Sequence, residues 1–290
     1  MVRLLSRMQI KPKIVTAFFL LVLLTACAAP SYQVPPPSDV SISRAVTEIN
    51  SARNRPAKSV SMAEANAAVE GVMHRLKPKA QSLCNYLAER SSASCRNWQV
   101  TVEDNNEFNA YATGSNEIVI YKGIIEQTYF IDEVALVLAH ELSHHILNHI
   151  NESGTNTLVG KLVGAMLGAA IAAYALGDVS CNPQFEDCNH VTDVIGDTVE
   201  TGANAGGYIA NQTYSVAQES EADLIAAYIL FDANFDLKKA REVILQLATE
   251  NEESRTRSSF FDTHPVGPER LAQFDNVIKE VMSNPGTPGQ

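Results

Sequence analysis

The stretch that most constrains this chain is residues 138–149, whose sequence LAHELSHHILNH holds four histidines. The apolar run ahead of it predicts a buried helix. Since each helical residue advances about 100°, His144 lies about 40° round from His140 and one turn further along. His145 and His149 lie about 140° and 180° from His140, so we predict that both are surface or capping residues. Only His140 and His144 are expected to converge on one point.

Glu141 stands beside that point and completes the pattern H-E-x-x-H, in which two histidines hold zinc and the glutamate is a general base. The alternative interpretation is a solvated helix face with unrelated polar residues. The apolar segment DEVALVLAHEL argues against it, because a buried histidine pair needs partners and a metal ion is the natural one. Asp132 is the expected N-cap of this helix.

A third ligand is expected from the segment SVAQESEADLIAAYIL, because a zinc ion with two histidines lacks one. Glu219 and Asp223 are four residues apart and share a helix face. If Glu219 binds the metal, Asp223 is placed to accept a ring N–H from a ligating histidine. Glu221 lies about 200° round from Glu219, so we expect it to point away and Glu221→Gln to be nearly silent. The alternative is a solvated acidic helix start that favours the helix dipole.

The N-terminal segment MVRLLSRMQIKPKIVTAFFLLVLLTACAAP has a basic start and a short apolar core, as a signal peptide has. Its LTAC sequence resembles a bacterial lipobox. We predict that residues 1–26 are removed, that Cys27 is lipidated, and that residues 27–59 form a flexible Pro-rich tether. By resemblance to enterobacterial lipoproteins, Ala28 after the cysteine implies sorting to the outer membrane, with the domain on the periplasmic face. A plain secretory signal or an N-terminal anchor helix is the alternative.

The charge of the chain limits its partners. The formal net charge is −11, and removal of residues 1–26, which hold four basic and no acidic residues, would leave −15. An acidic body argues against nucleic acid and against broad electrostatic binding to anionic lipid headgroups.

Four cysteines follow Cys27, and an even number in an exported chain predicts two disulfide bonds with three possible connectivities. Proximity favours Cys84 with Cys95 and Cys181 with Cys188. Free buried thiols and zinc thiolates are the alternatives.

Local patterns predict the remaining elements. The residues from Ser61 to Glu64 resemble a capping box, and the helix that follows is expected to break near Pro78. The segment NWQVTV alternates as a strand does, and NEFNAYATGSNEIVIYKGI predicts two short strands around Gly114 and Ser115.

Residues 151–215 form a long insert, which we interpret as a helical hairpin over the active site that acts as a lid. Gly160, Gly164 and Gly168 repeat every four residues and give a smooth helix face. Packing inside the domain, self-association or substrate contact, and membrane insertion are three alternatives for this face.

Three motifs in order, HELSH, ESEAD and DTHPVGPERL, resemble the gluzincin family of the CAAX prenyl protease and the heat-shock protease HtpX. The periplasmic lipoprotein members are the most similar in layout. The resemblance implies an α+β, mainly helical metallopeptidase domain over residues 60–282, with a small mixed sheet and the inserted hairpin. A flexible tail is expected at residues 283–290.

The resemblance also implies roles for single residues. His140, His144 and Glu219 would bind one Zn²⁺ per chain. Glu141 would be the base, and Asp223 and Arg270 would complete the active site. His264 would either donate to the oxyanion or cap the metal.

The implied function is a zinc endopeptidase, anchored to the envelope, that cleaves unfolded or misassembled periplasmic and outer-membrane proteins. The segment NAYATGSNEIVIYKGII, residues 109–125, resembles the family's edge-strand segment, and we expect its strand at residues 117–121 to pair with an extended substrate. One alternative is a chaperone-like lipoprotein that binds clients and has latent protease activity. Another is a structural lipoprotein stabilised by zinc.

Overall fold

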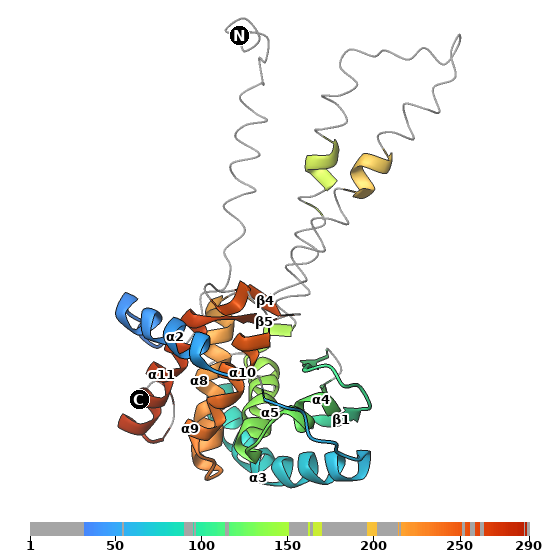
Figure 1. Cartoon of the computed structure of the whole chain (residues 1–290). Coiled ribbons are helices and arrows are strands. Elements are labelled where there is room, and N and C mark those ends of the chain that lie inside the picture. The colour runs from blue at the N-terminus through green and yellow to red at the C-terminus, as the bar shows by residue number, and fades with distance from the viewer. Residues whose placement is uncertain are drawn as a thin grey trace, which may run out of the picture. The chain divides into compact units, whose positions relative to one another are not determined.

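The computed structural model describes residues 32–53, 55–89, 95, 97–113, 116–150, 162, 165–169, 196–201, 214, 216–250, 253–255, 259–261, 264–286 and 288 (Figure 1). The fold is α+β and mainly helical, as predicted. In chain order, the elements are α2 (Asp39–Ser51), α3 (Met62–Ala88), β1 (Gln99–Glu103), β2 (Ala110–Ala112), β3 (Glu117–Tyr121), α4 (Lys122–Gln127), α5 (Ile131–Ile146), α8 (Val216–Asp232), α9 (Leu237–Ala240), α10 (Glu242–Glu250), the 3-10 helix η1 (Glu253–Arg255), β4 (Ser259–Phe261), β5 (His264–Val266) and α11 (Pro268–Ser283).

Helix α5 lies at the centre of the core. It packs against α8 and α3, and it also touches the sheet, α9 and α10 (Figure 1). Leu138, Leu142 and Ile146 are fully buried, and so is most of the helix between them. A helix that is apolar on nearly every side is stable only inside a domain, so its polar residues have to find partners within the protein.

The sheet has the order β1-β3-β2, with β1 parallel and β2 antiparallel to β3. The two strands expected around Gly114 and Ser115 are therefore present. The expectation that residues 117–121 pair with a substrate is wrong, because β3 is the central strand and both of its sides are paired. Strand β2 is at the edge of the sheet, where a chain can add.

Helix α3 begins with the predicted capping box, since Ser61 accepts from the N–H of Glu64 and Glu64 accepts from the N–H of Ser61. The predicted break at Pro78 is wrong, because the helix runs through it. Buried side chains precede and follow the proline, among them Leu76 and Ala80. Their packing outweighs a helix-interior penalty of about 3 kcal/mol.

The disulfide bond between Cys84 and Cys95 is present, as predicted. It joins the C-terminal turn of α3 to the segment that leads into β1. Cys181 and Cys188 lie outside the described residues.

The prediction of a flexible tether as far as residue 59 is wrong for the part that forms α2. Ser38 caps this helix, and Ala45 and Ile49 are buried in the core that α2 shares with α11. Arg241, which lies between α9 and α10, bridges α2 and α11. Its guanidinium donates to Glu48 of α2 at 2.6 and 2.8 Å, and to Asp275 of α11 at 2.6 and 3.1 Å.

The segment before α2 also lies against the core. Val34 is 8% exposed, and its carbonyl accepts from the side chain of Gln273. The carbonyl of Pro35 accepts from Asn276, one turn further along α11. Tyr32 packs against the core as well, so among the residues that the structure describes, contacts with the core start well before the helix.

Most of the insert, with Gly160 and Gly164, lies outside the described residues. Within its described parts, a Cβ atom on Gly168 would collide with the carbonyl of Thr198. The two helical pieces at residues 165–169 and 196–201 are therefore neighbours, as a hairpin requires. Among the described helices, none combines the length and apolarity that crossing a membrane demands.

Candidate metal centre

His140 and His144 converge as their spacing on α5 predicts. The two Nε2 atoms are 3.0 Å apart, and the rings are 5% and 0% exposed. Helical periodicity alone brings them together, because residues i and i+4 lie on one face. Both rings present the nitrogen that commonly binds metal ions.

Glu219 of α8 and His264 of β5 complete a cluster of four candidate ligands. Glu219 lies 3.3 Å from each Nε2 atom of the α5 pair, through one oxygen for each. Nδ1 of His264 is 2.8 Å from Oε1 of Glu219 and 3.4 Å from Nε2 of His140. One donor atom from each of the four residues lies within 4.8 Å of the others, so a single ion could bridge them.

The donor set fits a metal ion. Burial would raise the pKa of Glu219, but the positive charges of His264, Arg270 and His140 outweigh it and hold the pKa well below its usual value. Burial also keeps the pKa of His144 well below its usual range. An ionised carboxylate and a neutral imidazole are the forms that bind metals. Oε2 of Glu141 is buried beside them with no hydrogen-bond partner in the described part of the chain.

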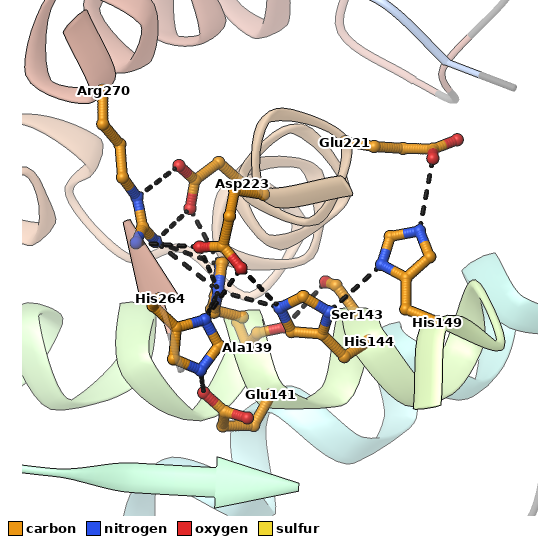
Figure 2. A network of polar contacts seen from close by, with 11 residues as sticks. Ala139, Glu141, Ser143, His144, His149, Glu221, Asp223, His264 and Arg270 are labelled. Atoms are coloured by element: carbon orange, nitrogen blue, oxygen red, sulfur yellow. Dashed lines mark hydrogen bonds and ion pairs between the residues drawn. The ribbon is translucent and has the colours of Figure 1, made fainter. Parts of the chain in front are cut away.

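Asp223 and Arg270 support the cluster from one side (Figure 2). Asp223 Oδ1 is 2.8 Å from Nδ1 of His140, the position from which it accepts the ring N–H. The Arg270 guanidinium donates to both oxygens of Asp223 at 3.0 Å and lies 2.8 Å from Oε2 of Glu219. Against burial, Glu219 and Asp223 raise the pKa of His140 to about 10. A cation bound there would compete with this proton.

Glu141 lies beside Nε2 of His264, whereas Glu219 lies beside Nδ1 of the same ring. Oε1 of Glu141 is 3.5 Å from Nε2 of His264, and burial raises the pKa of Glu141 above the usual value, against the nearby histidines. Glu141 and His264 also line a pocket whose walls are mostly apolar. The pocket is formed by Phe108, Asn109, Ala110, Ile124, Leu136, Val137, His140, Glu141, Val243, Ile244, Leu247, His264, Val266 and Arg270.

Two histidines expected at the surface are buried, so that prediction is wrong. His145 is 5% exposed, and its Nε2 is 3.3 Å from the carbonyl of Glu117. His149 is 2% exposed, and its Nδ1 is 3.1 Å from Nδ1 of His144. Helix α5 ends at Ile146, and Asn148 has a positive φ of 64°, which folds His149 back toward the cluster. Extrapolating an ideal helix beyond Ile146 therefore predicts the wrong position for His149.

Glu221 does face away from the cluster, as predicted, but into the protein. It is 3% exposed, and its Oε2 lies 3.3 Å from Nε2 of His149. Since a buried carboxylate with partners is costly to alter, the structure predicts a measurable loss for Glu221→Gln instead of the nearly silent effect expected from the helix angle.

Two further features were not predicted. Tyr214 stacks on His144, with ring centroids 3.8 Å apart and planes 20° apart, and no sequence motif marks it. Asp132 is not the N-cap of α5. That position is Phe130, and the carboxylate of Glu133 accepts the N–H groups of Tyr129 and Phe130, while Asp132 accepts the N–H of Asp236.

A buried H-E-x-x-H helix that meets a glutamate and a histidine beside an apolar pocket defines a metal-dependent peptidase. The sequence model of peptidase family M48 matches residues 74–278, which is more than half of the chain, and the chain belongs to this family. The resemblance to the HtpX and CAAX prenyl protease type is thereby confirmed. A search of curated proteins finds no match.

Proposed function

We propose that the protein is a zinc endopeptidase. The observation that carries this proposal is the four-residue cluster, in which two imidazoles and one carboxylate provide the ligand set of catalytic zinc sites. His140, His144 and Glu219 would hold the ion. When bound there, zinc would supply a Lewis acid that polarises the scissile carbonyl and acidifies water.

The protein residues then move the protons. Glu141 takes a proton from the attacking water and passes it to the leaving amine as the C–N bond breaks. Its pKa, raised by burial, suits both halves of this transfer. Asp223 holds the tautomer of His140 by accepting its ring N–H.

His264 occupies the fourth donor position in this arrangement. There it fills the space that a substrate carbonyl needs, so we propose that this is a capped state of the site. When displaced by substrate, the same imidazole would be near enough to donate to the developing oxyanion. His264→Ala should therefore keep the metal, since three ligands remain.

The pocket and the sheet favour an extended substrate. Phe108, Asn109 and Ala110 line the pocket, and Ala110 begins β2, which is one of the two edge strands of the sheet. A substrate backbone that adds to β2 would carry one apolar side chain into the pocket. Recognition through the backbone requires an unpaired extended segment, which an unfolded or misassembled protein offers along much more of its chain than a folded one.

The location is proposed from the sequence alone. Cys27 with its lipid would anchor the enzyme to the outer membrane on the periplasmic face, so its substrates would be periplasmic and outer-membrane proteins. Cys27→Ser should abolish acyl labelling and release the protein from membranes. Acyl labelling that persists in this variant would refute the lipid anchor.

The decisive experiment compares wild type with Glu141→Gln, using Glu70→Gln on the exposed face of α3 as the matched control. Both variants should bind one zinc per chain. Only Glu141→Gln should lose cleavage of an unfolded protein. Mass spectrometry of envelope proteins should show that the substrates accumulate in this variant alone. If Glu141→Gln clears clients as wild type does, the protein is a client-binding lipoprotein and the peptidase proposal fails.

A further inference from the structure

A second chain of polar contacts leaves the metal cluster on the side away from Arg270. Figure 2 shows Asp223 and Arg270 on one side of the cluster and His149 and Glu221 on the other. His149 Nδ1 lies 3.1 Å from Nδ1 of His144, and its Nε2 lies 3.3 Å from Oε2 of Glu221. The backbone N–H of Tyr32 donates to Oε1 of Glu221 at 2.9 Å.

When His144 binds a metal through Nε2, only one arrangement of protons gives every contact in this series a donor and an acceptor. Nδ1 of His144 then carries the hydrogen and donates to Nδ1 of His149. Nε2 of His149 carries its own hydrogen and donates to Glu221. Donors and acceptors alternate as far as a carboxylate, which is the best terminal acceptor.

The burial of these groups makes this series of polar contacts costly to break. His144, His149 and Glu221 are 0%, 2% and 3% exposed, so a lost partner is not replaced readily by water. His140 has the same need and meets it directly with Asp223 at 2.8 Å. The other histidine of the pair reaches its carboxylate through one more imidazole.

We propose that His149 and Glu221 are positioning residues that hold His144 in its metal-binding tautomer and orientation, and that the N-terminal segment completes this support at Tyr32. The proposal rests on the proposed metal site. In this proposal, His149 and Glu221 support His144 as Asp223 supports His140. The proposal also links the metal affinity to a segment more than a hundred residues away in sequence.

The test measures zinc affinity of the full-length protein by competition with a chromophoric chelator. His149→Leu removes the acceptor and should weaken zinc binding about 10–100-fold, the usual effect of losing such an outer partner. His149→Asn places an amide oxygen where Nδ1 was, so it should recover most of the affinity. His74→Leu on the exposed face of α3 is the control and should bind zinc as wild type does.

Two readouts separate positioning from a general packing role. With Co²⁺ in place of zinc, the visible spectrum should change in His149→Leu and return toward wild type in His149→Asn. In a double-mutant cycle, Glu221→Gln should weaken zinc binding in wild type but have no effect in His149→Leu, because it acts through His149. Equal effects of Glu221→Gln in both backgrounds would overturn the proposal.

The contribution of Tyr32 is tested through its backbone. Tyr32→Pro removes the N–H, whereas Tyr32→Ala keeps it. We expect a several-fold weaker zinc affinity for Tyr32→Pro than for Tyr32→Ala, and equal affinities would overturn the link to the N-terminal segment.

The failures of the two proposals are distinguishable. If His140→Ala also retains zinc, the metal site itself is wrong. If His140→Ala loses zinc while His149→Leu binds it as wild type does, only the positioning role fails. Should His149→Leu not fold, His149→Gln replaces it. Its amide reaches the Nε2 position and not Nδ1, so zinc affinity should still fall below that of His149→Asn, and equal affinities would refute the role.

Discussion

Reduction of the disulfide bond between Cys84 and Cys95 should destabilise the protein by an amount that its sequence spacing sets. The bond closes a loop with a sequence separation of 11 residues. In the chain-entropy model, a loop of this length restricts the unfolded state by about 2.8 kcal/mol at 25 °C. For a domain of this size, such a loss lowers the midpoint of thermal unfolding by on the order of 5–10 °C.

The assay is urea unfolding of a variant in which Cys181 and Cys188 are serine, so that only one pair responds to reductant. Dithiothreitol should lower its free energy of unfolding by about 2.8 kcal/mol. It should have no effect on the same protein carrying Cys84→Ala and Cys95→Ala. If the oxidised and reduced proteins unfold at the same urea concentration, the loop-closure argument is wrong for this chain.

Three further predictions concern the fold and the site. Gly123→Ala should lower the free energy of unfolding by about 1–3 kcal/mol, because a Cβ atom there would collide with the carbonyls of Asn106 and Glu107; an unchanged urea midpoint would refute this. Asp223→Asn should weaken zinc binding about 10–100-fold in the chelator assay, and an unchanged affinity would show that His140 does not need this acceptor. Zinc at a thousand times its dissociation constant should raise the free energy of unfolding by about 4 kcal/mol. Glu219→Gln should reduce that increase at the same zinc concentration, because it weakens a ligand.

The parts of the site that the sequence predicts are those in which contact follows from local geometry. His140 and His144 meet because four helical residues make about one turn, and Glu219 and Asp223 share a face of α8 for the same reason. The capping box at Ser61 and the disulfide between neighbouring cysteines are equally local. Such features need no knowledge of how distant segments pack.

The features that sequence analysis missed depend on tertiary structure. His149 returns to the site only because the chain turns at Asn148 after α5 has ended. Strand β3 is central because β1, which precedes it by more than ten residues, pairs with it in parallel. The proline-rich composition around α2 predicts a tether, but packing of Ile49 and the Arg241 contacts hold this segment against α11.

If the protein is anchored by a lipid on Cys27, the contacts of Tyr32 and Val34 limit how far its body can lie from the membrane. Cys27 is five positions before Tyr32, which makes the first contact with the body among the residues that the structure describes. Fully extended, these five positions span on the order of 17 Å, whereas a tether as far as residue 59 would span roughly 110 Å.

With the shorter span, a lipid on Cys27 would keep the body close to the membrane surface. An enzyme held this way would not search the depth of the periplasm. Under the proposed lipid anchor, its substrates would have to reach the membrane surface to be cleaved.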